Sequence, residues 1–208
     1  SSRQFSECAS PVKAPASLRI ALLALLAAEL TVASAPAVQA RRFEFDQRRT
    51  EVRFVYKMAY ATQRGRFTKV SGTLDYDEAA PGKSKINASI ASASLTTGEA
   101  LIDNELKGTD FFNVEGSPVI AFKSLEVRTD SPSTAKVAGE MTVNGITKPV
   151  TLQVRIESHD DPALKYDVGA RRFLATTRIQ RSAFNMTSYR SMVDDDVDIE
   201  IDAIARPR

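Results

Sequence analysis

The amino-acid sequence predicts an all-β protein, a closed antiparallel β-barrel of about eight strands with a short helical insertion near residues 99–113. Runs that alternate apolar and polar residues follow one another after Ala40, and turn residues separate them. Within Gly139–Ile156, an Asn-Gly pair lies between two such runs, which is a strong hairpin signal. Between residues 97 and 113 the alternation gives way to helical spacing.

Residues 1–40 resemble a secretory signal peptide in composition. The short apolar run Ile20–Leu26 follows a basic residue and leads to small residues that end at Ala40. Glu29 interrupts the apolar character, and spanning a bilayer takes about 20 apolar residues, so a cleaved signal is favoured over an uncleaved membrane anchor. We expect a signal peptide over 1–40 and one barrel domain over 41–208.

Composition argues against several classes of function. The net charge is +2, basic and acidic residues are interspersed, and there is no Trp, so nucleic-acid binding has little support. The only cysteine, Cys8, precedes the apolar run, so residues 41–208 contain neither a thiol nucleophile nor a disulfide. No Gly-rich phosphate-binding loop of the Walker or dinucleotide type occurs, and we expect no cofactor.

The first half of the barrel is predicted from four runs, of which the short first run is counted with the second as one strand. A short run, Phe43–Phe45, precedes Thr50–Tyr60, whose alternation places four large side chains on one face: Val52, Phe54, Tyr56 and Met58. The next run, Arg64–Tyr76, contains Gly72, which predicts a bulge or a bend. Small residues dominate the fourth run, Lys83–Leu95, and predict a wall that leaves space inside the barrel.

The insertion follows at Glu99–Leu106. Three apolar residues there have helical spacing: Leu101, Ile102 and Leu106. Thr97 or Gly98 is a candidate cap for its start, and Gly108 is expected to end it. A second short helical turn is predicted over residues 110–113, and the two adjacent phenylalanines there are candidates for a lid or plug.

Five further strands complete the barrel, over Pro118–Arg128, Ala135–Asn144, Thr147–Ser158, Arg172–Gln180 and Val197–Ala205. The Asn144-Gly145 pair favours a two-residue type I′ turn between the second and third of them. One face of that hairpin is apolar: Met141, Val143, Val150, Leu152, Val154 and Ile156. A barrel of about eight strands is just wide enough to hold one small ligand or to be filled by its own side chains.

No catalytic or metal site is predicted. The single histidine, His159, lies in a loop beside Asp160-Asp161, and no G-x-S-x-G nucleophile elbow is present. Neither this cluster nor Asp194-Asp195-Asp196 has the ligand spacing of a zinc or EF-hand site, so both are interpreted as solvated surface.

The candidate binding residues are apolar. Ten side chains are expected to line a pocket: Phe54, Tyr56, Met58, Leu101, Ile102, Leu106, Phe111, Phe112, Met141 and Phe173. The alternative is that these residues fill a solid core, which is the usual role of apolar residues at strand period.

The chain resembles the YceI-like family, the polyisoprenoid-binding or lipid-binding YceI domain. Six phrases carry the resemblance in order over residues 43–205: DQRRTEVRF, GRFTKVSG, LKGTDFF, PVIAFKS, Gly139–Leu152 and RSAFNM. The resemblance implies an extended lipocalin-like barrel whose pore holds an isoprenoid chain or a similar amphiphile, in a bacterial periplasmic protein. It also implies a mixed interior, with one end packed and the rest open to a ligand.

Five positions depart from the family pattern. Arg49-Thr50 stands where many members have His-Ser, and Met58 and Glu105 stand where members often have His. Asn185 replaces a usual Gly. The loss of titratable groups puts the headgroup contacts in doubt, and a Met in place of His would make that part of the pore more apolar and more adaptable.

These observations predict a non-enzymatic periplasmic carrier of isoprenoid lipids or quinone-type amphiphiles. Transient contact with a membrane and a homodimer are both compatible with that role. Five residues are candidates for the mouth, each expected at the surface rather than in contact with ligand: Arg49, Arg64, Arg66, Glu105 and Arg181. Two alternatives remain: an enzyme acting on an apolar substrate in the same pocket, and a stress-induced interaction module with a solid barrel.

Overall fold

The computed structural model describes residues 40–208, and the predicted signal peptide lies outside them except for Ala40. The described part contains eleven strands, the helix α1 (Ala100–Lys107) and four short 3-10 turns. The strands are β1 (Arg41–Phe45), β2 (Glu51–Met58), β3 (Ala61–Phe67), β4 (Val70–Tyr76), β5 (Lys85–Ala91), β6 (Leu95–Thr96), β7 (Val119–Ser131), β8 (Thr134–Val143), β9 (Ile146–Ile156), β10 (Arg171–Gln180) and β11 (Val193–Pro207). Within residues 40–208, no helix is long and apolar enough to cross a membrane.

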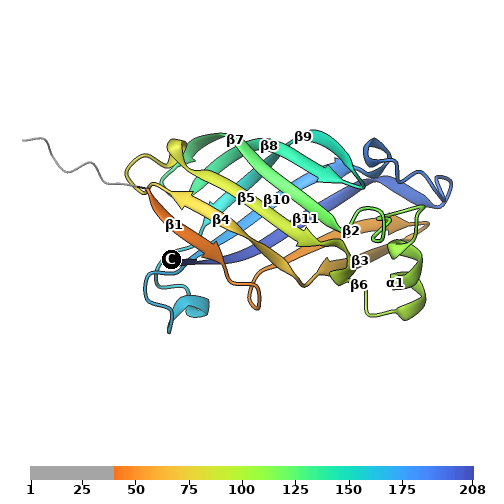
Figure 1. The fold of residues 1–208 in the computed structure, drawn as a ribbon, viewed down its shortest axis with the longest axis horizontal. Helices are drawn as coiled ribbons and strands as arrows, with labels where there is room; N and C mark the ends of the chain where they lie inside the picture. Colours follow the sequence, from red (N-terminus) through yellow and green to blue (C-terminus); the bar gives the residue numbers. More distant parts are fainter. Residues whose placement is uncertain (1–39) are drawn as a thin grey trace, which may run out of the picture. The chain divides into compact units, whose positions relative to one another are not determined.

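Eight of these strands form a closed antiparallel ring (Figure 1). The order β1-β4-β5-β7-β8-β9-β10-β11 returns to its start because β11 also pairs with β1. The predicted barrel of about eight strands is therefore confirmed. β2, β3 and β6 extend the sheet from β11 at the end of the barrel that carries α1.

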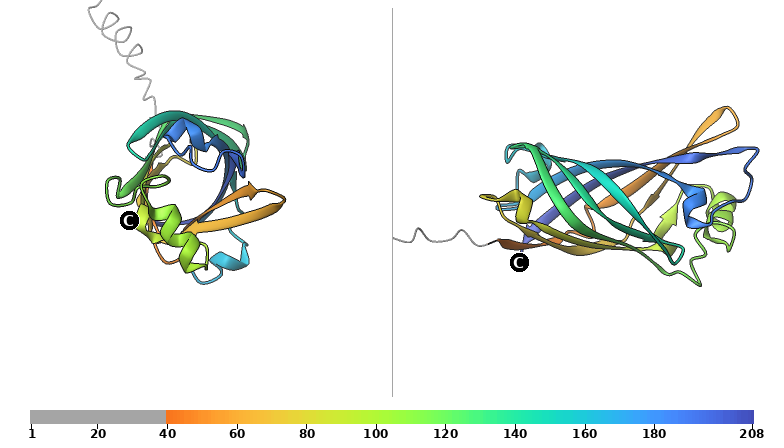
Figure 2. Two further views of the ribbon diagram at one scale, coloured as in Figure 1. Left: turned by 90° about the vertical axis from the view of Figure 1, so that its right-hand side faces the viewer. Right: turned by 90° about the horizontal axis from the view of Figure 1, so that it is seen from above.

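The extra strands arise because three predicted runs are interrupted, one of them where the turn at residues 92–94 separates β5 from β6. β11 has 15 residues and pairs with β2 over most of its length, but with β1 through its last residues. Residues 46–50 separate β1 from β2, and residues 68–69 separate β3 from β4. In the end-on view of Figure 2, the β2–β3 pair leans away from the ring and α1 lies at its rim.

The β8–β9 hairpin has the predicted turn. Asn144 and Gly145 have φ angles of 51° and 73°, and Val143 pairs with Ile146 across them. Two successive positive φ angles define a type I′ turn, which matches the twist of the two strands. Alternate residues of β8 are buried on the inner face, so the predicted alternation is confirmed as well.

Gly72 does not form the predicted bulge. The β4–β5 ladder runs through it without a shift in register, and Gly72 pairs with Ala88. A Cβ at this position would lie 2.2 Å from the carbonyl oxygen of Asn87, and the φ angle is +151°. Glycine is therefore needed because the two backbones approach closely.

The helix is confirmed at Ala100–Lys107, and Gly108 ends it as predicted. Its start differs from the prediction, because Glu99 is the N-cap residue and makes no side-chain capping hydrogen bond. Instead the Asp103 carboxylate accepts hydrogen bonds of 2.6 Å from both the backbone N–H and the hydroxyl of Thr97. Residues 110–113 form hydrogen-bonded turns rather than a helical turn, with the Asn113 N–H donating to the Gly108 carbonyl at 2.8 Å.

The inner face of the sheet carries the core. A large cluster fills the half of the barrel near α1, where buried side chains from β2, β7, β8 and β11 meet Leu106 and Phe111. Smaller clusters lie toward the other end, around Phe43 and around Val137. The largest buried cluster of the interior thus lies near α1.

Candidate functional site

Two cavities lie inside the barrel, with volumes of about 140 Å³ and about 80 Å³. No polar atom of the described residues faces either space. An apolar cavity offers water none of the hydrogen bonds that stabilise a buried water molecule. The interior is therefore hollow and suited to apolar groups, so the interpretation of a barrel filled solid with side chains is wrong.

The larger cavity exists because small residues form much of its wall. Five alanines from five different strands line it: Ala88, Ala121, Ala135, Ala175 and Ala203. Ala88 belongs to the stretch of small residues from which an open wall was predicted. Gly139 is not a wall residue, but a Cβ there would lie 2.4 Å from the Lys123 carbonyl oxygen and 2.6 Å from the ring of Phe122, which does line the cavity. The ring lies against the backbone of Gly139, because that position has no Cβ.

The smaller cavity lies under α1 and the turn that follows it. Phe112 from that turn packs on two rings of the sheet, with ring centroids 5.9 Å from Phe54 and 5.3 Å from Phe67. Phe111 is buried beside it and stacks on Tyr189 at 6.1 Å. These contacts place aromatic side chains at one end of the hollow, and their role as a lid or plug stays a prediction.

The structure brings seven of the ten predicted pocket residues to the cavity walls. Phe54, Tyr56, Leu106, Phe111 and Phe112 line the smaller cavity, Phe173 lines the larger, and Met141 lines both. Whether these side chains contact a ligand stays a prediction.

Three of the ten line neither cavity. Leu101 is 86% exposed, because it lies on the side of α1 that faces away from the barrel. Ile102 packs partly buried against the core cluster, and Met58 lies half-buried at the end of β2, where it pairs with Val193. Ile102 and Leu106 are four residues apart and share one face of the helix, whereas Leu101 is rotated by about 100° from Ile102, so its outward position could have been read from the spacing.

Several wall residues were missed by the sequence analysis. Val70, Ile90, Ile120, Ile179 and Ile199 are examples, and all are β-branched residues on the inner faces of strands. Their period-two spacing was visible, but that spacing does not distinguish a packed position from a cavity wall.

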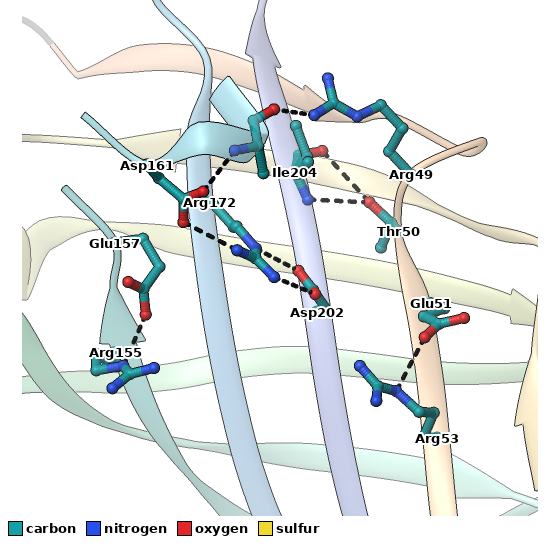
Figure 3. Close-up of polar contacts among 11 residues, drawn as sticks. Arg49, Thr50, Glu51, Arg53, Arg155, Glu157, Asp161, Arg172, Asp202 and Ile204 are labelled. Atoms are coloured by element: carbon teal, nitrogen blue, oxygen red, sulfur yellow. Dashed lines mark hydrogen bonds and ion pairs between the residues drawn. The ribbon is translucent and has the colours of Figure 1, made fainter. Parts of the chain in front are cut away.

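The polar groups on wall residues are turned away from the hollow. The buried hydroxyl of Thr50 makes two hydrogen bonds to the backbone of Ile204, accepting from its N–H at 3.2 Å and donating to its carbonyl at 3.3 Å (Figure 3). The buried Ser84 hydroxyl accepts from the N–H of Asp77 at 3.2 Å. Burial raises the pKa of Tyr56 and of Tyr76, so both phenols stay neutral well above neutral pH.

Arg181 is not at the surface, contrary to the sequence prediction. It is only 4% exposed, and its guanidinium donates to four backbone carbonyls: Met186 (2.7 Å), Ser188 (2.8 Å), Val193 (2.9 Å) and Asp194 (3.0 Å). Desolvation lowers its pKa from the ordinary arginine value. Arg181 therefore secures the loop between β10 and β11, and only its carbon atoms face the smaller cavity.

The other four predicted mouth residues lie away from the hollow. Arg49 pairs with Asp167 and donates to the Ala163 carbonyl. Arg64 and Arg66 are exposed on β3, alternating with the buried Gly65 and Phe67. The Glu105 carboxylate accepts a hydrogen bond of 3.1 Å from the Tyr189 hydroxyl.

Charged residues pair on the outer surface of the barrel (Figure 3). Arg172 on β10 lies between two carboxylates, 2.6 Å from Asp202 and 2.9 Å from Asp161. His159 is exposed in the loop after β9, as predicted. Among residues 40–208, no group of three or more His, Cys, Asp or Glu side chains could hold a metal ion.

Comparison with known proteins finds a family match over almost all of this barrel. The YceI-like domain model matches residues 43–205. A UPF0312 protein of Pectobacterium atrosepticum is 33% identical over 188 residues, which cover 88% of this chain and 95% of the relative.

Solved structures agree on the fold. The crystal structure of Burkholderia cenocepacia BcnA matches with a TM-score of 0.70 and 24% identity, over 77% of this chain and 98% of that one. A polyisoprenoid-binding domain from Saccharophagus degradans, implicated in plant cell wall breakdown, matches with a TM-score of 0.59 and 11% identity, over 82% of this chain and all of that domain.

Proposed function

This chain belongs to the YceI-like domain family, and from that premise we propose that it is a non-enzymatic carrier for an isoprenoid lipid or a quinone-type amphiphile. The single observation that carries the proposal is the hollow interior, whose walls present only apolar atoms. The polyisoprenoid-binding domain of Saccharophagus degradans, which has the same fold, supports the choice of ligand class.

The physical basis is the hydrophobic effect. Moving an apolar tail from water into a dry space gains about 0.8 kcal/mol for each buried CH₂ group. Such a wall forms no directional bonds, so one hollow accepts several related tails. A polar headgroup would lose its hydrogen bonds inside these walls, so it stays outside the two cavities.

We place this activity in the bacterial periplasm. The support is the predicted signal peptide over residues 1–40, together with the bacterial sources of the relatives. A carrier in that compartment collects its ligand at one site and releases it at another, and transient contact with a membrane is needed wherever one of the two sites is a membrane.

The cavity walls favour binding over catalysis. General acid–base or nucleophilic catalysis needs a polar group within hydrogen-bond reach of the substrate. Among the described residues, none presents such a group to either cavity.

Native mass spectrometry of the full chain purified from a bacterial host tests the proposal. We expect an adduct with the mass of an isoprenoid lipid or quinone, removed by organic extraction. Ala135→Leu should reduce it strongly, because Ala135 lines the larger cavity. Ala138→Leu adds the same bulk to the outer face of β8 and serves as the matched control. An unmodified protein that carries no adduct and takes up no fluorescent isoprenoid analogue contradicts the carrier function.

A further inference from the structure

The two cavities are neighbours that share part of their wall. Five residues line both: Val52, Ile90, Ile120, Met141 and Ile199. We call this set the waist. Its members come from β2, β5, β7, β8 and β11, and Ile90 and Ile120 are direct partners across the β5–β7 ladder. The waist divides the hollow into a larger compartment, lined by Tyr76 and Phe173, and a smaller one under α1.

The waist is crossed by any tail that occupies both compartments. β11 contributes Ala203 to the larger cavity and Val193 to the smaller one. That stretch of strand is ~33 Å long at ~3.3 Å per residue. A strand tilt of about 40° reduces it to ~25 Å along the barrel axis. A short tail therefore has room in one compartment, whereas a long tail has to pass between the five waist side chains.

One waist residue differs in kind from the other four. Valine and isoleucine are branched at Cβ, which restricts them to few χ1 rotamers. Methionine is unbranched, has three rotatable bonds and adapts to irregular spaces. Met141 is also only 8% exposed, so its side chain lies inside the barrel. It is thus the part of the waist that moves aside at least cost.

We propose that the waist, with Met141 as its movable member, determines which tail lengths this protein accepts. The inference rests on the proposed carrier function and adds a determinant of specificity to it. A short prenyl tail binds in one compartment without disturbing the waist. A long tail binds across both compartments only if the Met141 side chain swings aside.

Prenyl alcohols of increasing length test this: geraniol, farnesol, geranylgeraniol and solanesol. They share one headgroup, so only the tail varies. Radiolabelled alcohol retained by the full chain after gel filtration gives the binding at each length. In Met141→Trp, we expect solanesol binding to fall by at least about tenfold, which corresponds to about 1.4 kcal/mol, while geraniol binding changes less than about twofold. In Met141→Ala, solanesol binding should be retained.

A matched control separates the waist from general loss of space. Leu152 lines only the larger cavity, so Leu152→Phe should weaken short and long tails together. Ile120→Phe narrows the waist from β7 and should give the same dependence on tail length as Met141→Trp. This second variant keeps the test decisive if Met141→Trp does not fold. Circular dichroism and thermal melting confirm the fold of each variant.

The outcomes distinguish the inference from the function beneath it. If the unmodified protein binds alcohols but Met141→Trp and Ile120→Phe weaken all lengths equally, or none, the waist does not select by length and the inference is overturned. If the unmodified protein binds no alcohol of any length, the carrier function itself is refuted.

Discussion

At the scale of single residues, the interior depends on places where glycine faces an aromatic ring. A Cβ at Gly65 would lie 2.2 Å from the ring of Phe54, on the neighbouring strand that pairs with it. The Phe54 ring lies over the glycine backbone, and its centroid is 5.9 Å from the ring centroid of Phe112. Glycine at this position therefore places an aromatic side chain on the wall of the smaller cavity.

Gly65→Ala should destabilise the protein by about 1–3 kcal/mol, the usual cost of overpacking a core. Urea unfolding followed by circular dichroism measures it. In a Phe54→Leu background the same change should cost less, because the ring that meets the new Cβ is absent. Equal costs in the two backgrounds would show that the ring is not the reason for glycine.

At the scale of elements, α1 and the turn after it (residues 100–113) form one segment that covers the smaller cavity. Leu106, Phe111 and Phe112 line the smaller cavity, whereas Leu101 faces outward. Both Phe112 contacts are to rings of β2 and β3. Ring packing and the Tyr189–Glu105 hydrogen bond therefore hold this segment against the barrel, and no strand ladder includes it.

Phe112→Ala should speed the release of a bound prenyl alcohol and lower stability, since it removes both ring contacts. Stopped-flow displacement of a fluorescent isoprenoid analogue measures the release rate. Leu101→Ala truncates an exposed residue of the same helix and should leave release and melting unchanged. A release rate for Phe112→Ala equal to that of Leu101→Ala would argue that ligand leaves through another route.

The elements themselves were largely predictable, because period-two alternation and turn residues act locally. The Asn144-Gly145 turn is an example in which two residues determine the geometry. The separation of β1 from β2 was not predictable, since β11 pairs with each through a different part of its length. Likewise the Thr97–Asp103 interaction depends on a side chain reaching back from within α1.

At the scale of the whole molecule, the site was predictable in kind but not in detail. An apolar inner face follows from alternation, and seven predicted residues do line the cavities. The position of the waist depends on how side chains from five strands meet in space. Local sequence does not encode that arrangement. The burial of Arg181 was not predictable for the same reason, because it depends on how the loop folds back and brings its carbonyls to the guanidinium.

Acid should destabilise the whole barrel through its surface carboxylates. Hydrogen bonds lower the pKa of Asp161 (from the Ala163 N–H, then Arg172), Asp195 (from Ser182), Asp198 (from Arg178) and Asp75 (from Arg42) below the ordinary 3.8. A lowered folded-state pKa contributes stability that is fully present above the unfolded value and is lost as pH falls through the folded one.

The melting temperature should therefore be steady from neutral pH down to about pH 4 and fall below it. Scanning calorimetry over that range measures the fall. Asp161→Asn should melt lower at neutral pH and show a shallower decline in acid, because one titrating carboxyl has been removed. A wild-type melting curve that does not respond to pH below 4 would contradict the assignment.

The pairing of β1 with β11 joins strands that are separated by almost the entire barrel sequence, with Phe43 opposite Pro207. Contacts between distant parts of a chain form late, because the loop between them has to close first. We therefore expect the barrel to close late in folding. A chain exported unfolded, as the proposed signal peptide implies, would take up its ligand only in the compartment that it reaches.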